Sequence, residues 1–450
     1  MASTLLSRTP GVAGNRRKWT FSTWVKIGVV GGSRVLFASP SDGTNYNELW
    51  FSGSAFRFDQ WTSGSSAGSL VTNRLFRDPA AWYNIVCVWD SDNATPGDRM
   101  KLYVNGVEET SFSLDTNPAQ YLDSYVNSTS YPLEVGGMNA GEYFGGMMAH
   151  THFADGQAYA PTVFGETDST SGIWVPISAP SVTYGTNGFF LKYASGALGT
   201  DSSGEGNNMA VSGTMTNTKD TPNNNFATMT PLNASAAVTL SNGDTTVFGN
   251  TTSSGNVSVA ICPDTGKWYA ECKYATIVSN YPRAGVFQLN DRDFGRLQNS
   301  TAGAAGEATN GVQYSAAGAM TTGGSETGSW GSAVSAGGIV QLAIDSDNGA
   351  IYIGVNNTWQ NSGVPTSGAT RTGAATTWTA GPPPTGDSTG TAFGDACYNG
   401  SYSNWNFGNG YFGTTAVTSA EADGNGEGQF EYAPPTGYFA LCTNNLGSES

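Results

Sequence analysis

Short runs in which aromatic or β-branched residues alternate with small polar residues recur along the chain. "KWTFSTWVKI" at residues 18–27 is one such run, and "GKWYAECKY" at residues 266–274 is another. A period of two places alternate side chains on opposite faces of a β-strand. Clusters of Gly, Asn and Ser between the runs are typical of tight turns. Since no helical period extends beyond about two turns, the sequence predicts an all-β fold of antiparallel β-sandwich (jelly-roll) domains.

The length of the chain requires more than one hydrophobic core. Its 450 residues exceed what one core usually organises. Strand-like runs fill residues 1–166 and resume over residues 236–450, whereas residues 167–235 are polar and rich in Asn, Gly and Thr. We therefore expect two β-sandwich domains, 1–166 and 236–450. The polar connector 167–235 should pack on one of its neighbours, because it is too long for a simple loop.

The turn sequence Asp-Ser-Asp-Asn occurs twice, at residues 90–93 and 345–348. Each copy follows one strand-like run and precedes another run that ends in an Asn turn. Because Asp and Asn start turns by hydrogen-bonding to their own backbone, each copy predicts a hairpin in its own sandwich. The side chains of these turns that could supply calcium ligands are Asp90, Asp92, Asp345 and Asp347. Calcium at these turns is the alternative to our expectation that the protein has no cofactor.

The charge of the chain argues against one class of partners. The net charge is −16, whereas a nucleic-acid-binding protein needs a basic face to neutralise phosphates. No run of about 18 apolar residues occurs, so we expect no membrane insertion. Basic residues cluster near the N-terminus at Arg8, Arg16, Arg17 and Lys18. We interpret this cluster as a docking arm for an acidic protein, and expect removal of residues 2–18 to leave the sandwiches folded.

No complete catalytic or metal-binding motif is visible in the sequence. The five cysteines include no C-x-x-C pair, so we expect reduced, structural thiols. The two histidines, His150 and His152, lack a third metal ligand at a fixed spacing. No G-x-S-x-G nucleophile motif occurs. The N-terminus lacks the apolar core of a signal peptide, which indicates synthesis in a cytoplasm.

Several of these segments resemble known families. "WTFSTWVKI", "WYNIVCVWD", "MKLYVNGV" and "EYFGGMMAHTHFADGQAY" resemble, in this order, the concanavalin-A-like lectin and laminin-G group. "GKWYAECKY", "VQLAIDSDNGAIYIGVNN" and "NWNFGNGYF" resemble a SPRY domain. The N-terminal "LLSRTPGVAGNRRKWTFSTWVK", the polar middle and "YAPPTGYFALCTNN" near the end together resemble virion proteins of marine bacteriophages. This resemblance implies a component of the virion surface, made in the cytoplasm of the bacterial host.

The resemblance implies a non-enzymatic structural protein, a lectin-like tail fibre, spike or receptor-binding protein for host-surface glycans. A capsid decoration or head-fibre protein is one alternative, and a virion-associated polysaccharide-degrading enzyme is another. Lectin-like glucanases carry an E-x-D-x-x-E strand, which Glu166-Thr-Asp168 begins but Ser171 does not complete. A SPRY-type peptide-binding adaptor is a third alternative. The expected partners are other virion proteins, through the basic arm, and further copies of the chain in a homo-oligomer, a trimer.

Glycan binding would use aromatic side chains near turns, which stack on sugar rings. The candidates are Trp50, Trp61, Tyr402 and Trp405. Core packing is the alternative for each of them, because aromatic residues in sandwiches mostly fill the core.

Overall fold

A computed structural model describes residues 4–28, 31–289, 312–322, 325–378 and 390–447. Its secondary structure is 46% strand and 5% helix, in several antiparallel sheets, which confirms the all-β prediction. The chain divides into two compact units, unit 1 (residues 1–217) and unit 2 (residues 218–450). Among the described residues, no helix has the length and apolar character needed to cross a membrane.

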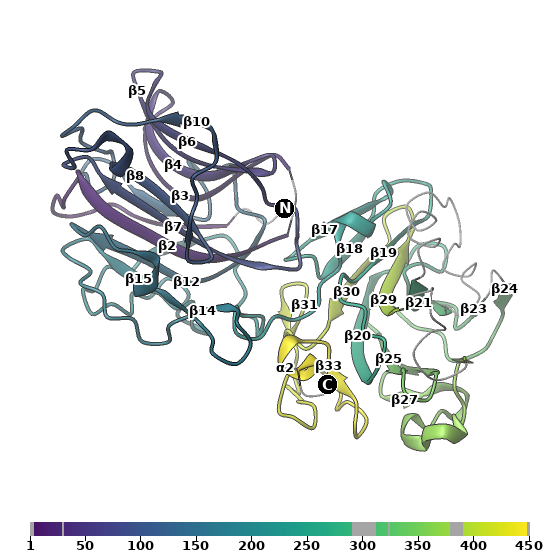
Figure 1. Cartoon of the computed structure of the whole chain (residues 1–450). Coiled ribbons are helices and arrows are strands. Elements are labelled where there is room, and N and C mark those ends of the chain that lie inside the picture. The colour runs from purple at the N-terminus through teal and green to yellow at the C-terminus, as the bar shows by residue number, and fades with distance from the viewer. Residues whose placement is uncertain (1–3, 29–30, 290–311, 323–324, 379–389, 448–450) are drawn as a thin grey trace. The chain divides into compact units, whose positions relative to one another are not determined.

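Unit 1 contains an eight-stranded and a six-stranded antiparallel sheet (Figure 1). The larger sheet consists, in spatial order, of β10 (Phe112–Thr116), β6 (Ser65–Leu75), β5 (Ala55–Thr62), β4 (Asn45–Ser52), β3 (Ser33–Asp42), β11 (Leu133–Val135), β1 (Leu5–Arg8) and β16 (Ala210–Ser212). The smaller sheet consists of β15 (Phe189–Leu191), β12 (Gly146–Asp155), β2 (Lys18–Ile27), β7 (Trp82–Asp90), β8 (Met100–Val104) and β9 (Val107–Glu108).

The two sheets of unit 1 pack face to face through buried aromatic side chains. Trp19 and Phe21 of β2 lie against Phe37 of β3, with ring centroids 6.3 and 4.7 Å apart. Phe153 of β12 also lies 5.5 Å from Phe37. Since Phe37 belongs to the larger sheet and the other three rings to the smaller one, one core joins both sheets into a sandwich.

The predicted connector does not form a separate part of the structure. Residues 167–217 belong to unit 1, where β15 pairs with β12 and β16 pairs with β1, while residues 218–235 belong to unit 2. Polar side chains order this stretch by binding its backbone. The Asn207 amide, for example, donates to the carbonyl oxygens of Thr186 (3.0 Å) and Gly188 (2.8 Å). The boundary between the units therefore lies at residues 217 and 218.

Unit 2 is built from a nine-stranded and a six-stranded sheet. The larger sheet consists of β17 (Val238–Ser241), β18 (Thr246–Gly249), β30 (Tyr402–Asn406), β20 (Lys267–Thr276), β25 (Ile339–Asp345), β26 (Ala350–Val355) and β27 (Thr358–Trp359), with β28 (Thr376–Thr377) beside β26 and β33 (Phe439–Ala440) beside β20. The smaller sheet consists of β19 (Gly255–Ser258), β29 (Gly390–Cys397), β21 (Arg283–Leu289), β22 (Val312–Ser315), β23 (Met320–Thr322) and β24 (Ser325–Thr327).

The hydroxyl group of Tyr274 links the two sheets of unit 2. This residue lies in β20 of the larger sheet, and its hydroxyl donates to the carbonyl oxygen of Tyr314 in the smaller sheet. The same oxygen accepts from the backbone N–H of Ala284 in β21 (2.8 Å). Because all three residues are buried, these hydrogen bonds satisfy polar groups inside the core.

The remaining elements are short. Two small hairpins are formed by β13 (Gly165–Thr167) with β14 (Trp174–Pro176), and by β31 (Tyr411–Phe412) with β32 (Thr415–Ala416). The helical elements are η1 (Pro96–Asp98), η2 (Pro161–Val163), η3 (Pro231–Asn233), η5 (Gln360–Ser362), η6 (Pro365–Thr370) and α2 (Thr443–Leu446).

Both Asp-Ser-Asp-Asn turns join antiparallel neighbours, as predicted. The first copy connects β7 to β8, and the second connects β25 to β26. The first connection also contains η1, whereas the second passes directly from Asp345 to Ala350, its opposite residue.

Candidate functional site

The two sheets of unit 1 differ in how their outward faces are covered. On the six-stranded sheet, Phe164 packs on Val86 and Val88. Trp174 of β14 also reaches this sheet, where its Nε1 donates to Asn84 Oδ1 (3.1 Å). The outward face of the eight-stranded sheet, in contrast, presents half-buried aromatic side chains from β4 and β5. We therefore place the candidate site on the eight-stranded sheet.

Strand alternation and register assemble this site. The inward residues of β4 and β5 include Leu49 and Phe58, which are opposite each other and belong to the core. The outward residues form three cross-strand pairs, which we call the outer ladder: Tyr46 with Trp61, Glu48 with Asp59, and Trp50 with Arg57. Directly opposite side chains in an antiparallel pair lie close enough to interact. The outer ladder is thus one continuous surface of aromatic and charged groups.

Three aromatic rings belong to the outer ladder. The rings of Tyr46 and Trp61 have centroids 6.2 Å apart and planes inclined by 19°. Trp50 lies on the same strand as Tyr46, and the Arg57 guanidinium is 5.2 Å from the centroid of its ring. All three rings are half-buried, so each is held by its neighbours and still reaches the surface. Such rings offer flat apolar surface at a small cost in conformational entropy.

Asp59 holds the charged and aromatic parts of the outer ladder together. Its carboxylate is 1% exposed. Asp59 Oδ2 accepts from Trp50 Nε1 (2.9 Å) and from Arg57 Nε (2.9 Å), and Asp59 Oδ1 accepts from the hydroxyl of Ser69 in β6. These hydrogen bonds fix the Trp50 ring and the Arg57 guanidinium in one arrangement. The side chains of the outer ladder are therefore preorganised.

Glu48, opposite Asp59, is a buried carboxyl group with incomplete hydrogen bonding. It is 4% exposed, and its Oε1 has no hydrogen-bond partner within the described ranges. Burial raises the pKa of Glu48 to about 8, and the nearby charges of Glu142 and Asp59 add to this effect. The group is consequently protonated at pH 7, and a protonated carboxyl can donate a hydrogen bond.

The predicted aromatic residues of unit 2 do not form a comparable surface. Trp405 is 0% exposed in the core, where its Nε1 donates to Asp395 Oδ2 (2.9 Å), so its prediction as a sugar-stacking residue is wrong. The reason is that β30 lies in the interior of its sheet, between β18 and β20. Tyr402 is half-buried, with the Phe248 ring centroid 6.5 Å away.

The four aspartates of the repeated turns are engaged with other groups. The contacts are Lys18 Nζ with Asp90 (3.2 Å), Arg17 with Asp92 (3.9 Å), Lys267 Nζ with Asp345 (3.2 Å) and the Gly266 N–H with Asp347 (2.8 Å). Across the described ranges, no group of three or more His, Cys, Asp or Glu side chains is placed to hold a metal ion. These contacts lie at the ends of the strands that the turns connect.

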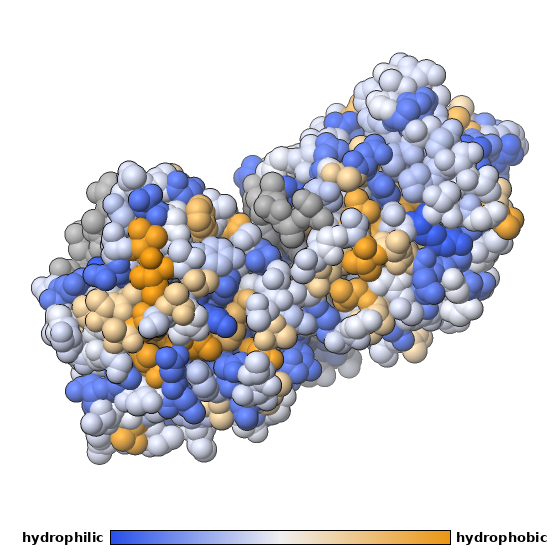
Figure 2. Space-filling view, turned by 180° about the vertical axis from the view of Figure 1, so that it is seen from behind, coloured by the Kyte–Doolittle hydropathy of each residue, from blue (hydrophilic) through white to orange (hydrophobic). Residues whose placement is uncertain are grey.

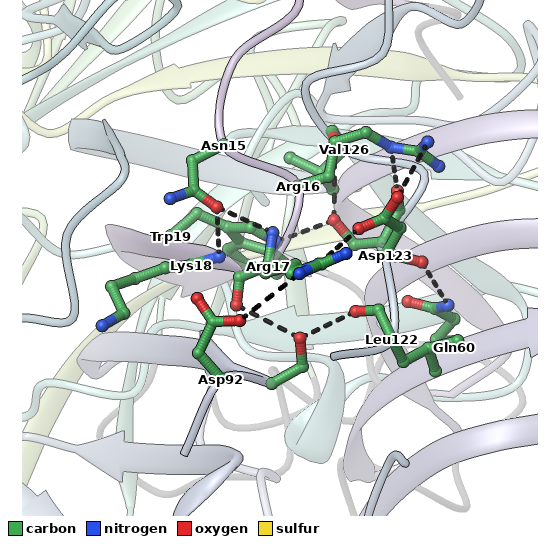
Figure 3. A network of polar contacts seen from close by, with 12 residues as sticks. Asn15, Arg16, Arg17, Lys18, Trp19, Gln60, Asp92, Leu122, Asp123 and Val126 are labelled. Carbon is green, nitrogen blue, oxygen red and sulfur yellow. Dashed lines mark hydrogen bonds and ion pairs between the residues drawn. The ribbon is translucent and has the colours of Figure 1, made fainter. Parts of the chain in front are cut away.

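The basic N-terminal cluster is part of unit 1, so it is not a separate docking arm. Arg8 lies in β1, inside the eight-stranded sheet. Figure 3 shows Arg17 between Asp92 and Asp123, and Arg17 Nε lies 2.9 Å from Asp123 Oδ1. Arg16 also pairs with Asp123, at 3.5 Å. Since acids of the same unit neutralise these cations, little positive charge remains to attract an acidic partner.

A shallow depression of about 380 Å³ lies over these ion pairs. Its lining residues are Gly14, Asn15, Arg16, Arg17, Asp92 and Asp123. None of these lining residues is aromatic, in contrast to the outer ladder.

Sequence reasoning identified Trp50 and Trp61 but missed the other four residues of the outer ladder. The missing signal is the two-residue turn at Gly53 and Ser54 in "NYNELWFSGSAFRFDQW". Gly53 adopts a φ of +62°, which glycine accommodates readily. Counting back from the pair that flanks this turn, Ser52 and Ala55, gives the register of the whole ladder.

Comparisons with known proteins support the predicted content of the first unit. Residues 6–163 match the Laminin_G_3 family model, described as the concanavalin A-like lectin/glucanases superfamily. No curated protein matches the chain.

Two solved structures match parts of the chain distantly. The SPRY domain of human HERC1 is 13% identical over 39% of this chain and 96% of that chain, with a TM-score of 0.29. Domain 4 of AbnA, a GH43 extracellular arabinanase from Geobacillus stearothermophilus in complex with arabinotriose, is 15% identical over 33% of this chain and 65% of that chain, with a TM-score of 0.24. TM-scores of this size do not establish a shared fold, so the SPRY-like character of unit 2 stays a prediction.

Proposed function

We propose that the protein is a non-enzymatic carbohydrate-binding protein that binds glycans on the outer ladder of unit 1. The observation that carries this proposal is the gathering of Tyr46, Trp50 and Trp61 on one accessible sheet face. Sugar rings have apolar faces that stack on aromatic rings, and their hydroxyl groups require polar partners beside the stack. The similarity of residues 6–163 to the concanavalin A-like superfamily adds support.

Binding of a sugar requires no rearrangement of the outer ladder. One face of the Trp50 ring carries the Arg57 guanidinium, so a sugar stacks on the other face or on the Tyr46 and Trp61 pair. Affinity arises mainly from stacking, and the polar groups orient the sugar.

The burial of Asp59 and Glu48 favours binding of a glycan over its hydrolysis. A glycosidase requires two carboxyl groups that reach opposite sides of the scissile bond. Asp59 already accepts hydrogen bonds from Trp50, Arg57 and Ser69, and both it and Glu48 are buried. Carboxyl groups that are buried in this way cannot approach a sugar carbon.

The biological setting we propose is the surface of a bacteriophage particle. The support is the resemblance of both ends and the polar middle of the chain to phage virion proteins. In this setting the protein is a tail fibre, spike or receptor-binding protein for host glycans, or a capsid decoration. Figure 2 shows hydrophobic side chains gathered in a few patches on the surface of both units. Such patches suit contacts with other virion proteins or with further copies of the chain, as in the expected trimer.

Substitution of the aromatic residues tests the binding site. We expect Trp61→Ala and Trp50→Ala each to lower glycan affinity at least about tenfold, as for other buried aromatic anchors in interfaces. Isothermal titration calorimetry with a glycan that wild-type protein retains on an array measures this loss. Tyr402→Ala is the matched control, because it removes a half-buried ring from unit 2 and should leave affinity unchanged. Equal affinity of all three variants and the wild type contradicts the proposal.

The position on the particle requires a separate experiment. Labelling intact virions with an antibody against the chain, followed by electron microscopy, distinguishes tail from capsid. Label at the tail tip supports host attachment, and label over the capsid supports decoration. Absence of the chain from purified particles contradicts the virion setting without bearing on glycan binding.

A further inference from the structure

The proposed function leaves open which glycans the outer ladder accepts, and the charges around it answer this. The site contains one cation, Arg57, which is already paired with Asp59. Glu48 lies on the next strand, and Glu142 acts electrostatically on Glu48. The carbonyl oxygen of Glu142 accepts from Val35 N–H (3.0 Å), and Val35 is opposite Trp50 in the sheet. Glu142 therefore lies beside the ladder, and its side chain is exposed.

A further acidic side chain lies along the same face of the sheet. Glu134 of β11 is 8% exposed and shares the neighbour Ala38 with Glu48. Leu133 and Val135, on either side of Glu134, belong to the core, so Glu134 is on the outward face. Its carboxylate accepts a hydrogen bond from the Asn139 N–H (2.8 Å). This side of the ladder thus adds the acidic side chains of Glu142 and Glu134.

An anionic sugar would be disfavoured on such a surface. A carboxylate or sulfate on the ligand needs a cation with free donors, and like charges in a partly buried site repel more strongly than in water. Asp59 occupies Arg57 Nε and also lies 3.4 Å from its Nη2. An uncharged sugar meets no such repulsion, and its hydroxyl groups can donate to the acidic oxygens of the face.

We propose that the outer ladder, if it binds glycans as proposed above, selects uncharged polysaccharides and rejects those that carry carboxylate or sulfate groups. Glu142 and Glu134, beside the aromatic rings, act as a charge filter, while the rings supply affinity. Binding of the uncharged polymer should also be insensitive to salt, because no ligand charge is screened.

A pair of polymers that differ only in charge tests this inference. Polygalacturonate and its carboxyl-reduced form share one backbone, and the array adds other acidic polysaccharides with their desulfated or carboxyl-reduced forms. We expect uncharged members to be retained at least about tenfold better, with the signal lost in Trp61→Ala. If acidic members bind better and Trp61→Ala abolishes this, the charge inference is wrong while glycan binding by the ladder stands. If no signal depends on Trp61, the proposed function itself fails.

Charge reversal at Glu142 provides a second test of the charge filter. Because Glu142 is exposed, Glu142→Lys should leave the fold intact while adding a cation beside the ladder. We expect it to improve binding of acidic glycans roughly three- to tenfold and to leave uncharged glycans unaffected. Glu166→Lys, the same change at an exposed residue of β13, is the matched control. An unchanged ratio of acidic to uncharged binding in Glu142→Lys overturns the charge filter.

Discussion

The two Asp-Ser-Asp-Asn regions place their strands in the same way but treat their carboxylates differently. In unit 1, Lys18 of β2 is directly opposite Asp90 of β7, and in unit 2, Lys267 of β20 is directly opposite Asp345 of β25. The distance from lysine Nζ to aspartate Oδ2 is 3.2 Å in both pairs. Each lysine is followed by a buried tryptophan that enters the core.

Backbone hydrogen bonds repeat as well. The serine N–H of each turn donates to the carbonyl oxygen of the residue before the lysine, Ser91 to Arg17 (2.8 Å) and Ser346 to Gly266 (3.0 Å). At the far end of the hairpin in unit 2, Asn356 Oδ1 accepts a hydrogen bond from the Ile339 N–H (2.9 Å). In unit 1, Asn105 Oδ1 accepts one from the Asn84 N–H in the same way (2.8 Å). The short motif thus sets the register of three strands.

The difference lies in how completely the first aspartate is satisfied. Asp345 is 0% exposed, and Asn348 donates to both of its oxygens, from the backbone N–H and from Nδ2 (2.9 Å each). The side chain of Asp90 is 14% exposed, and its Oδ1 has no hydrogen-bond partner in the part of the chain that the structure describes. The longer connection in unit 1 contains η1 in place of a tight turn. The motif therefore determines strand pairing, while the loop that follows determines burial.

The largest effect is expected from removing residues 2–18, which distinguishes the units most sharply. This deletion removes β1, which lies between β11 and β16 and contributes the core residue Leu6 (1% exposed). It also removes Lys18. We expect unit 1 to unfold, while unit 2 retains its own two sheets. Hydrogen exchange measured by mass spectrometry should show full exchange in unit 1 and unchanged protection over residues 218–450.

A second variant separates the loss of β1 from the loss of charge. Substituting Arg16, Arg17 and Lys18 together by alanine keeps β1 and removes the three cations. Protection of β3 to β6 should survive in this variant. If it survives equally in the deletion, the N-terminal segment is an independent arm after all.

The next largest effect is expected at the two turn aspartates. Asp345→Ala leaves Lys267 and both Asn348 donors without their buried acceptor, so we expect a loss of about 3 kcal/mol. Asp90→Ala removes a more exposed and less satisfied carboxylate, and we expect a loss of about 1 kcal/mol. Urea unfolding of each variant, followed by hydrogen exchange within each unit, measures both values. Equal losses would show that the difference in burial has no energetic consequence.

Much of this arrangement could be predicted from the sequence. Alternation in "KWTFSTWVKI" and "GKWYAECKY" predicts β2 and β20, and the repeated turns predict two hairpins. These features depend on local turn chemistry and on a period of two, both of which a single sequence contains.

The candidate site was predicted only in part, because burial depends on distant strands. Trp405 follows a Gly- and Asn-rich turn like an exposed residue, but its strand is interior to the sheet. Residues 167–217 are rich in polar residues, yet side-chain hydrogen bonds such as those of Asn207 order them within unit 1. Arg16 and Arg17 are neutralised by Asp123, which lies more than 100 residues later in the chain. No local pattern contains these pairings.

The pH dependence of two buried glutamates extends the comparison. Glu48 in unit 1 and Glu271 in unit 2 have pKa values raised to about 8 and about 7, in both cases mainly by burial. Glu271 accepts hydrogen bonds from the backbone N–H groups of Glu431 (2.9 Å) and Tyr432 (2.8 Å), whereas Glu48 Oε1 has no partner in the described ranges. Unit 2 again satisfies its carboxylate more completely.

Replacement by glutamine should therefore act in opposite directions. The folded-state pKa of Glu48 exceeds its ordinary value of 4.5, so its ionisation costs stability as pH rises from about 4.5 to about 8, and the cost is constant above pH 8. We expect Glu48→Gln to be close to wild type at pH 5 and more stable than wild type by a few kcal/mol at pH 9. Glu271→Gln should be destabilising at both pH values, since an amide N–H₂ would face donors. Thermal unfolding at pH 5 and pH 9 checks this, and a Glu48→Gln variant without benefit at pH 9 contradicts it.

The smallest effect is expected at Arg17, which belongs to the ion-pair network that unit 1 adds around its turn. The side chain of Arg17 is 45% exposed, as is that of its partner Asp123. Exposed ion pairs contribute little and are screened by salt. We expect Arg17→Ala to reduce stability by less than about 1 kcal/mol at low salt, with no difference from wild type in 1 M NaCl. A loss above about 2 kcal/mol would mean that the network, and not only the Lys18 and Asp90 pair, holds the turn.

The same variant also tests where glycans bind. Glycan affinity should not change in Arg17→Ala, because Arg17 lies outside β4 and β5. A loss of affinity like that of Trp61→Ala would instead place the binding site at the depression over Arg16 and Arg17.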